Sequence, residues 1–408
     1  MKKETPYRVD DLPNVNINSL TQEQRNVLEV FTETYTKILA GKSPPQFLLN
    51  IDGTAGCGKT YLISAICQEL CRMARENDQP DPIRVVAPSG VAALNISGRT
   101  IHSAFSLPIN NDFVRLTGSR LANHQLLYIW EGVQFVIFDE KSMIGARTLA
   151  QVDWRSRQLC PRAADKPFSN LNIALVGDFA QLPPVGDSPL YAPPSETAND
   201  VVRHGSGLYN LFNESHRLQT VHRQSSNSPE QIQFRDLLRH ASEGGLSQDE
   251  WRTLLTRSEN KLSPAVKAQF EDAMCLSTTR SEVEAVNLSH LVALNQPCAR
   301  IMARHDGGSG AAKVEADKAG GLESYVVLAR GAKVMFTRNI YQELGLEISK
   351  AFSGFCLQVL NFAIILNLGL VNATTGILED IIWAPDFTRS ELPIVALVSC
   401  PTYTGPTL

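Results

Sequence analysis

The stretch QFLLNIDGTAGCGKT (46–60) places an apolar run directly before a glycine-rich turn that ends in Lys59 and Thr60. The run QFLLNID (46–52) is short, apolar and preceded by the breaker GKSPP, which is typical of a buried strand. The residues after the turn, YLISAICQELCRMAR (61–75), have the length and apolar spacing of a helix. The sequence therefore predicts a strand, a tight loop and a helix in immediate succession.

The loop GTAGCGKT (53–60) matches the pattern GxxxxGK[ST] in the strand–loop–helix context that this pattern requires. Glycines let backbone N–H groups approach phosphates, and the helix that follows adds the positive end of its dipole. We expect Lys59 to reach the β- and γ-phosphates, and the Thr60 hydroxyl to coordinate Mg²⁺. A glycine turn without a ligand is the alternative, but the combined pattern favours phosphate binding. The residues expected to contact the nucleotide here are Gly53, Thr54, Ala55, Gly56, Cys57, Gly58, Lys59 and Thr60.

Three further apolar runs indicate the fold. IRVVAP (83–88), VQFVIFDE (133–140) and LNIALVGD (171–178) resemble the first run, and mostly helical or mixed stretches of about 30 to 45 residues separate the four. Buried strands that alternate with helical crossovers predict an α/β fold with a doubly wound parallel sheet.

Two polar groups follow strands of this predicted sheet. VIFDE (136–140) ends in two carboxylates, of which Asp139 would hold Mg²⁺ and Glu140 would act as general base toward the attacking water. An acid pair at a strand end is a weak signal alone, but it becomes strong after a phosphate-binding loop. GDFAQLPPV (177–185) places Gln181 where nucleotides bind in open α/β sheets, so Gln181 could sense the γ-phosphate; a merely polar loop is the alternative.

The string APSGVAALNISGRTIHSAFSLP (87–108) carries small hydroxyl donors suited to phosphates, among them Thr100 and Ser103. His102 and Phe105 could stack on bases, which is how single strands are held without sequence preference. Chemistry alone favours a different interpretation, in which Phe105 belongs to the core and His102 is a satisfied buried imidazole.

In this order, the strings GTAGCGKT, APSGVAALNISGRTIHS, VIFDEKSMIG and GDFAQLPPV resemble the petite-integration-frequency type of ATP-dependent DNA helicase. These are RecD-like members of helicase superfamily 1, which move 5′→3′ along single-stranded DNA. The resemblance covers about 20–340 and 367–400. It implies ATP and Mg²⁺ as cofactors, single-stranded DNA as partner, and roles in DNA repair, recombination and telomere maintenance.

Two more strings extend the resemblance. In LTQEQRNVL (20–28), Gln24 matches the family's adenine-contacting glutamine, and in RLQTVHRQ (217–224), Arg223 matches its γ-phosphate-reaching arginine. The resemblance thus gives Lys59, Glu140, Gln181 and Arg223 as the hydrolytic set, with Thr60 and Asp139 for the metal. The residues that it implies for DNA contact are Arg99, Thr100, His102, Ser103 and Phe105.

The resemblance also implies a domain plan for the chain. It consists of a loose arm (1–19), a complete RecA-like lobe (20–215), a partial second RecA-like lobe (216–340), an atypical apolar insert (341–366) and a remainder of the second lobe or the start of its small barrel (367–408). Within the second lobe we expect a helix at 231–245, a strand at 272–279, a helix at 280–294 and two strands in 324–339.

The chain departs from the family at the insert, at Ala373, where the family has glycine, and in lacking the later HKSQG string. These departures leave a second hypothesis open, in which the chain is a truncated, non-translocating protein that binds ATP and DNA.

The amino-acid composition excludes several classes of protein. Lys and Arg (38) nearly balance Asp and Glu (42), and the net charge of −4 argues against a polycation that holds nucleic acid by bulk charge. The eight cysteines form no CxxC pair, which favours reduced thiols in an intracellular protein. No targeting signal decides between nucleus and mitochondrion. The uncharged stretch 351–370 is long enough for a membrane span but carries polar residues, so we expect no membrane insertion. The sequence gives no indication of the oligomeric state.

Overall fold

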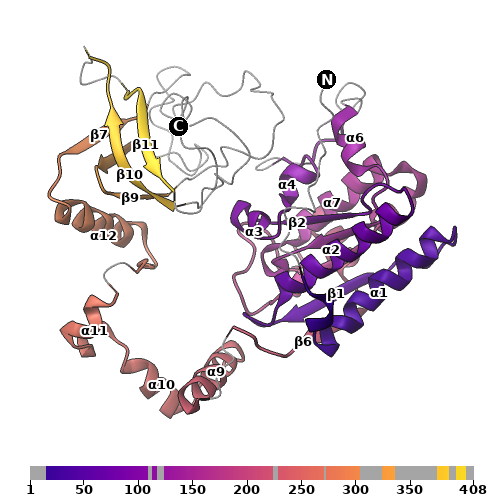
Figure 1. Ribbon diagram of the computed structural model, residues 1–408, viewed down its shortest axis with the longest axis horizontal. Coiled ribbons are helices and arrows are strands. Elements are labelled where there is room, and N and C mark those ends of the chain that lie inside the picture. The colour runs from indigo at the N-terminus through magenta and orange to yellow at the C-terminus, as the bar shows by residue number, and fades with distance from the viewer. Residues whose placement is uncertain are drawn as a thin grey trace. The chain divides into compact units, whose positions relative to one another are not determined.

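The chain divides into two compact units, Met1–Thr253 and Leu254–Leu408, drawn in Figure 1. The computed structural model describes residues 15–108, 113–116, 124–223, 228–270, 273–303, 324–335, 375–385 and 392–400. No helix in these ranges is long and apolar enough to cross a membrane.

The first unit is built on a six-stranded parallel sheet with the strand order β3-β2-β4-β5-β1-β6. The strands are β1 (Leu48–Gly53), β2 (Ile83–Ala87), β3 (Arg99–Thr100), β4 (Phe135–Phe138), β5 (Asn172–Gly177) and β6 (Glu214–Leu218). Each of the four apolar runs contains one of these strands, so the predicted parallel α/β sheet is confirmed.

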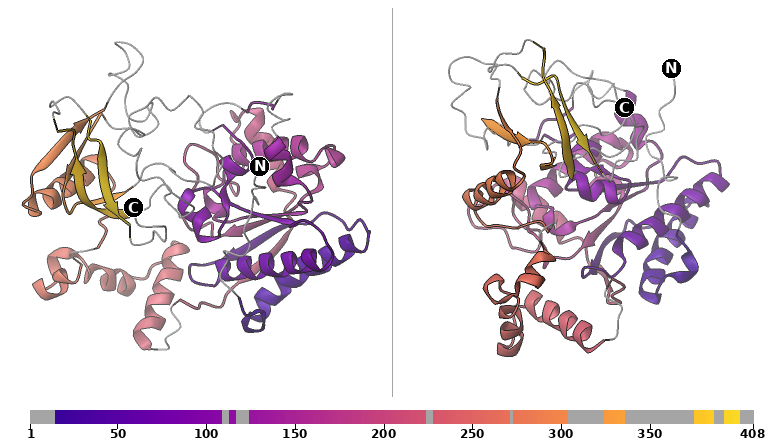
Figure 2. Two further views of the ribbon diagram at one scale, coloured as in Figure 1. Left: turned by 45° about the horizontal axis from the view of Figure 1, so that its top comes forward. Right: turned by 60° about the vertical axis from the view of Figure 1, so that its left-hand side comes forward.

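Helices cover both faces of this sheet, as the two views of Figure 2 show. They are α1 (Gln22–Leu39), α2 (Lys59–Glu76), α3 (Gly90–Asn95), α4 (Ile101–Ala104), α6 (His124–Trp130), α7 (Ala146–Leu159) and α8 (Asp200–Tyr209). Successive residues of β4 alternate between two cores. Ile137 packs with α1 and α2 on one face, whereas Val136 and Phe138 pack with α7 and α8 on the other. This burial on both faces explains why the strands are continuously apolar.

The predicted boundary at 215 is wrong, because it cuts strand β6. Ser215 pairs with Asn50 and Leu218 pairs with Gly53, so β6 completes the sheet of the first unit. The compact unit then continues to Thr253.

The end of the predicted loose arm is also packed. Val15 and Leu20 are each 4% exposed, and a short 3-10 helix (Ile17–Ser19) lies between them. The Val15 backbone N–H donates to the Gln68 side chain of α2 at 3.1 Å. Residues 15–19 therefore belong to the first unit rather than to a free arm.

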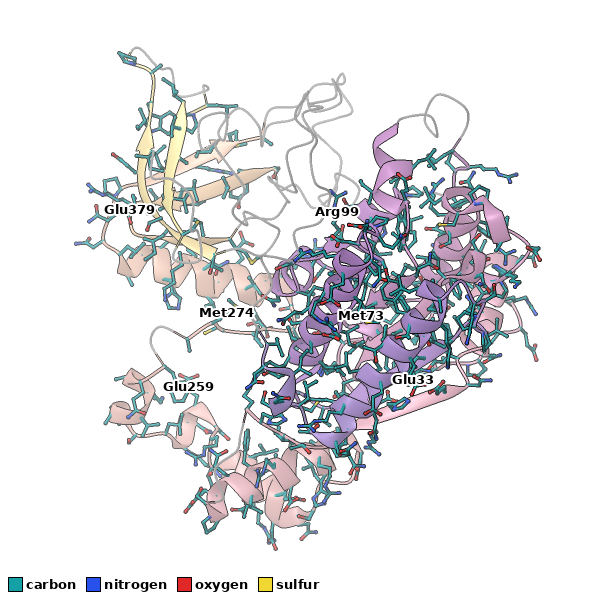
Figure 3. All side chains as sticks on the ribbon, turned by 45° about the vertical axis from the view of Figure 1, so that its right-hand side comes forward. Glu33, Met73, Arg99, Glu259, Met274 and Glu379 are labelled. Atoms are coloured by element: carbon teal, nitrogen blue, oxygen red, sulfur yellow. The ribbon has the colours of Figure 1, made fainter. Side chains whose placement is uncertain are left out.

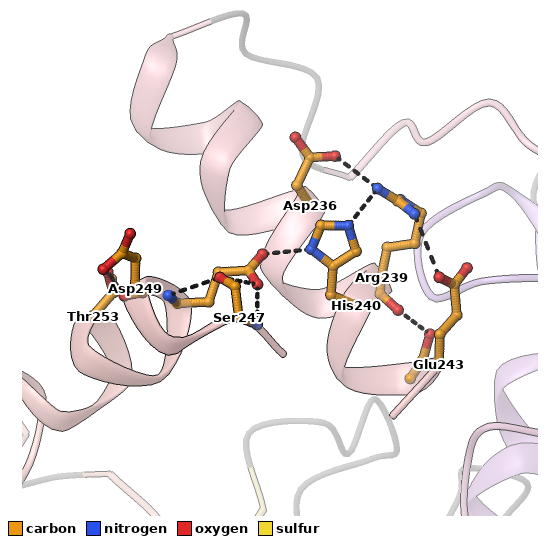
Figure 4. Close-up of polar contacts among 9 residues, drawn as sticks. Asp236, Arg239, His240, Glu243, Ser247, Asp249 and Thr253 are labelled. Carbon is orange, nitrogen blue, oxygen red and sulfur yellow. Dashed lines mark hydrogen bonds and ion pairs between the residues drawn. The ribbon is translucent and has the colours of Figure 1, made fainter. Parts of the chain in front are cut away.

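Two helices follow the sheet, α9 (Pro229–Ser242) and α10 (Gln248–Leu255). Hydrogen bonds between polar side chains connect the two helices (Figure 4). His240 Nδ1 lies 2.5 Å from Glu250 Oε1, and its other ring nitrogen lies 2.7 Å from Arg239 Nη2. Glu250 also accepts the Ser247 N–H at 2.8 Å, and the hydrogen bonds from Ser247 and from His240 lower the pKa of Glu250 to about 2. The helix expected at 231–245 is thus confirmed as α9, and its end is fixed by side-chain contacts.

The described part of the second unit contains short helices and antiparallel strands. These are α11 (Pro264–Ala268), α12 (Arg280–Ala293), the pair β7 (Cys298–Met302) and β8 (Tyr325–Ala329), and the three-stranded sheet of β9 (Lys333–Met335), β10 (Thr375–Ile382) and β11 (Val395–Ser399). The helix at 280–294 and the two strands in 324–339 are confirmed.

The strand expected at 272–279 is wrong, because the described residues 273–279 form no strand. Met274, labelled in Figure 3, is 73% exposed and Leu276 is 90% exposed, so no strand of the described ranges covers this apolar run. No parallel strand pair occurs among the described residues of this unit, and the partial second RecA-like lobe stays a prediction. The insert at 341–366 lies outside the described residues.

A long-range side-chain contact caps helix α7. Gly145 precedes this helix and supplies no capping side chain. Instead Asp187, from the segment after β5, accepts the backbone N–H groups of Arg147 and Thr148, both at 3.0 Å. The same carboxylate accepts the N–H of Ser188 at 2.7 Å. One acid therefore satisfies the start of α7 and anchors the end of the segment that carries Gln181.

Replacing Asp187 by alanine should lower the free energy of unfolding by about 1–2 kcal/mol, because the first turn of α7 loses its acceptor. Urea denaturation of the two proteins measures the difference. Asp200→Ala is the matched control, since Asp200 lies in the first turn of α8 but the cap there is Asn199. It should change stability by less than about 0.5 kcal/mol. Equal effects of the two substitutions would contradict the capping role.

Candidate nucleotide-binding site

The loop between β1 and α2 takes its shape from two glycines in the left-handed region, Gly56 (φ +84°) and Gly58 (φ +81°). A Cβ atom on Gly56 would lie 2.7 Å from Arg223 Cβ, and one on Gly58 would lie 2.7 Å from Gln24 Nε2. Both conformation and space therefore require glycine here. Gly58 is the N-cap of α2 and offers no side-chain cap, so the first N–H groups of the helix face outward from its end.

Lys59 lies across this loop. Its ammonium donates to the carbonyl oxygens of Gly53 at 2.8 Å and Thr54 at 3.1 Å. Thr54, Ala55 and Thr60 are exposed along the loop. The expected phosphate-binding groups thus lie together at the start of α2.

Cys57 departs from the rest of the loop, because its side chain points inward and is 2% exposed. A Cβ atom on Gly53 would lie 2.4 Å from Cys57 Sγ, so the thiol packs beneath the end of β1. Burial raises the pKa of this thiol, which remains protonated at neutral pH. Only the backbone of Cys57 can therefore contact a phosphate.

The acid pair lies at the end of β4, beside β2. The backbone N–H of Asp139 donates to Val86 O at 2.9 Å, and its carboxylate accepts the N–H of Glu140 at 2.9 Å. Asp139 is 6% exposed. The pKa of Asp139 is raised to about 6, chiefly by burial and to a smaller extent by the Glu140 charge, while the hydrogen bond from the Glu140 N–H and the Lys59 charge act in the opposite direction. The Asp139 carboxylate and the Lys59 ammonium are therefore close enough to interact.

Helix α1 meets the loop through Gln24. This glutamine is 2% exposed; its amide donates to Gly58 O at 3.3 Å and its oxygen accepts the Thr21 N–H at 3.0 Å. The capping box of α1 therefore holds the residue that the resemblance assigns to adenine. Next to it, Glu23 accepts the N–H of Gln219 at 2.8 Å, a contact that the sequence analysis missed and that no local pattern indicates.

The segment that follows β6 lies on the glycine loop. The backbone N–H groups of His222 and Arg223 donate to Gly56 O at 2.8 and 3.3 Å. The side chain of Arg223 is exposed. Main-chain hydrogen bonds therefore hold Arg223 at the phosphate-binding loop, although Arg223 and the preceding strand β6 are far from this loop in the sequence.

Gln181 lies in a turn directly after β5. Its N–H donates to Asp178 O at 3.0 Å, and the Asp178 carboxylate accepts the N–H of Ala180 at 3.0 Å. Gly177, which precedes this turn, pairs with Asp52 on β1, so the turn begins beside the residue that precedes the glycine loop. The ends of β1, β4, β5 and β6 thus gather the predicted residues at one edge of the sheet.

The residue after the acid pair was not singled out by the sequence analysis. Lys141 is 0% exposed, and its ammonium contacts the carboxylate of Asp52, on β1. The signal that could have found it is a lysine that directly follows two acids at the end of a buried strand.

For one residue of the segment expected to contact DNA, Phe105, the predicted role is wrong. Phe105 is 0% exposed and its ring packs against Trp130 (centroids 4.5 Å apart) and Phe138 (6.0 Å). Phe105 therefore belongs to the core, as the alternative had it, and cannot stack on a base. His102 is half-buried, and burial lowers its pKa, so its ring is neutral at neutral pH.

Thr100, which the resemblance assigns to DNA contact, is 8% exposed and serves the start of α4. The Thr100 hydroxyl accepts the Ser103 N–H at 3.2 Å, as the N-cap. Arg99 and Ser103 are partly exposed.

A parallel sheet of this order, with a glycine loop between its β1 strand and the following helix and an acid pair at the end of β4, defines a P-loop protein with a RecA-like lobe. The profile of the family described as PIF1-like helicase matches residues 19–252. The chain therefore belongs to the PIF1-like helicase family, whose members are ATP-dependent and thus use a nucleotide.

Individual relatives agree with this assignment. The ATP-dependent DNA helicase PIF1 of Saccharomyces cerevisiae is 30% identical over 295 residues, which are 71% of this chain and 31% of that protein. The Pif1 helicase of Candida albicans has a similar fold, with a TM-score of 0.57 at 22% identity over 89% of this chain and 69% of that one. A Bacteroides Pif1 in complex with ADP-AlF3 and ssDNA gives 0.55 at 19% identity, over 89% and 70%. The chain spans less than a third of the length of the curated relatives it matches.

Replacing Asp139 by asparagine should stabilise the protein at pH 7.5. The pKa rises from 3.8 to about 6 on folding, so the folded state loses stability as the pH increases through this window and the carboxylate becomes charged. Each pKa unit corresponds to about 1.4 kcal/mol, which sets a gain of up to about 3 kcal/mol. Urea denaturation of both proteins at several pH values measures it. The gain should vanish below about pH 4, and a gain that does not depend on pH would contradict this origin.

Replacing Phe105 by alanine should lower the free energy of unfolding by about 3–5 kcal/mol, because it leaves a cavity between two rings. Thermal or urea unfolding measures the loss. Tyr191→Ala is a suitable control, since Tyr191 is 55% exposed, and it should cost far less. A Phe105→Ala protein that is as stable as the wild type but binds DNA more weakly would contradict the core position and support stacking of Phe105 on a base.

Proposed function

We propose that this chain is the nucleotide-binding part of an ATP-dependent DNA helicase that moves 5′→3′ along single-stranded DNA. One observation carries the proposal: the glycine loop, the acid pair and Arg223 lie at a single edge of the parallel sheet. The contacts of Arg223 and His222 with Gly56 O, and of Gln24 with Gly58 O, join the glycine loop directly to the segment after β6 and to helix α1. The Saccharomyces cerevisiae relative named above is an ATP-dependent DNA helicase.

We assign to each residue the role in ATP binding or hydrolysis that its motif predicts. Lys59, at the start of α2, provides the positive charge for the β- and γ-phosphates. Glu140 is the general base that takes a proton from the attacking water. Gln181 and Arg223 contact the γ-phosphate from the ends of β5 and β6, and Gln24 recognises the adenine beside the loop.

The oxygen ligands at this edge suit Mg²⁺. Thr60 is exposed at the start of α2, and Asp139 is a buried carboxylate near Lys59. Hydroxyl and carboxylate oxygens are the ligands that Mg²⁺ prefers, and a dication would offset the cost of burying the Asp139 charge. When bound, Mg²⁺ neutralises charge on the phosphates.

Single-stranded DNA is the proposed partner. A Bacteroides Pif1 binds ssDNA, and Arg99, His102 and Ser103 offer this chain donors for a phosphate backbone, whereas Thr100 is 8% exposed. Because Phe105 is buried, stacking in this segment is left to His102. Such a helicase would act in DNA repair, recombination and telomere maintenance, in the nucleus or the mitochondrion.

Lys59→Ala and Glu140→Gln should separate binding from hydrolysis. Lys59→Ala removes the charge that faces the phosphates, so ATP affinity and turnover should both be lost. Glu140→Gln keeps the loop intact, so ATP should still bind while hydrolysis slows by about 10²–10⁴-fold. Calorimetric titration with ATP and a phosphate-release assay give the two quantities.

The same assay, run with and without single-stranded DNA, tests the helicase function. Stimulation of hydrolysis by DNA supports a motor. Binding of ATP and DNA without stimulated turnover would favour the non-translocating alternative, and equal loss of ATP affinity in both variants would contradict the separate roles of Lys59 and Glu140.

A further inference from the structure

The buried lysine that follows the acid pair has no part in the roles assigned above. The ammonium of Lys141 contacts the Asp52 carboxylate, lies 3.4 Å from Asn50 Oδ1 and stands 4.6 Å from the centroid of the Phe179 ring. Asp52 and Asn50 come from β1, while Phe179 follows β5. Lysines are almost never fully buried unless they are paired, and here the Asp52 carboxylate is the partner.

The main chain at this position joins two strand ends. Glu140 has left-handed backbone angles (φ +51°, ψ +51°), which are unfavourable for a residue with a Cβ atom. A Cβ atom on Gly177 would lie 2.7 Å from Lys141 N and 3.0 Å from Lys141 Cγ. The backbone of Glu140–Lys141 is therefore packed against the residue that precedes Asp178.

The acidic partner of Lys141 connects it to the rest of the site. Asp52 directly precedes Gly53, the first residue of the glycine loop, and its other carboxylate oxygen accepts the Ser215 hydroxyl at 3.0 Å. Ser215 lies on β6, the strand that leads to Arg223. One side chain thus ties the end of β4 to β1 and, through Asp52, to β6.

Stability alone gives little reason for this pair. Burial of the ammonium carries a desolvation cost, and an apolar residue of similar size is often as good or better for stability. The Asp52 side chain is 38% exposed, so water can solvate it if its partner is lost.

We propose that Lys141 is a positioning residue for ATP hydrolysis, which holds the strained backbone of Glu140 in place by anchoring it to Asp52. This role rests on the proposed function. The ammonium does not touch the reacting atoms; it fixes the general base relative to the glycine loop and to the Asp178 turn.

Lys141→Met tests this role, because methionine keeps the length of the apolar stem and removes the charge. ATP affinity should stay within about twofold of the wild type, since the glycine loop is unchanged. The turnover number kcat should fall about 10–100-fold, as misplacement of a catalytic group by about 1 Å can cost 10²-fold. The thermal midpoint should be unchanged or higher. A residue needed only for folding would not give this split.

Asp52→Asn should lower kcat in the same direction. If the pair acts as a unit, the double variant with Lys141→Met should be no slower than Lys141→Met alone, because interacting residues are not additive. Arg157→Met is the matched control, since Arg157 pairs with the buried Asp153 at 2.9 Å on α7. It should lower the thermal midpoint and leave kcat unchanged.

The outcomes separate this proposal from the function on which it rests. A wild-type chain that neither binds nor hydrolyses ATP would overturn both. Wild-type turnover with unchanged kcat in Lys141→Met, or a loss of ATP affinity that matches the loss of kcat, would overturn the role of Lys141 alone.

Discussion

Parallel pairing of β4, β5, β1 and β6 is the constraint on which the first unit depends. Parallel strands that are joined by crossovers bring their carboxyl ends to the same edge. The glycine loop, the acid pair, the Gln181 turn and Arg223 each follow one of these ends, so the topology gathers residues that are up to 170 positions apart, such as Gly53 and Arg223. Short contacts such as that of Gly56 O with the His222 N–H complete the assembly.

Much of this arrangement follows from the sequence, because its signals are local. The buried strands are continuous apolar runs, and the glycine loop has a fixed spacing next to Lys59 and Thr60. The acid pair stands at the end of such a run. These features predicted the parallel sheet and the gathering of the loop, Asp139–Glu140 and Gln181 at one edge.

The errors arise where a neighbour in space decides the outcome. The resemblance assigned Phe105 to DNA contact, but Trp130 and Phe138 enclose its ring. The run at 272–279 has the composition of a strand, but its described residues 273–279 pair with no strand in the part of the chain that the structure describes. The predicted boundary divided β6 because the exposed residues of this strand give no sign in the sequence that it pairs with β1. Lys141 was missed because its partner Asp52 lies on another strand, and the sequence does not show which distant charged residues form an ion pair.

The position of β1 between β5 and β6 also shapes how the unit folds. Leu48 pairs with Ile173 and Leu49 with Glu214, so both neighbours of this strand are made more than a hundred residues after it. At ordinary rates of translation, the strand that precedes the glycine loop waits on the order of ten seconds for its second partner. Until then its edge is open to other strands, so the nascent chain is most prone to aggregation while its nucleotide-binding strand is still unpaired.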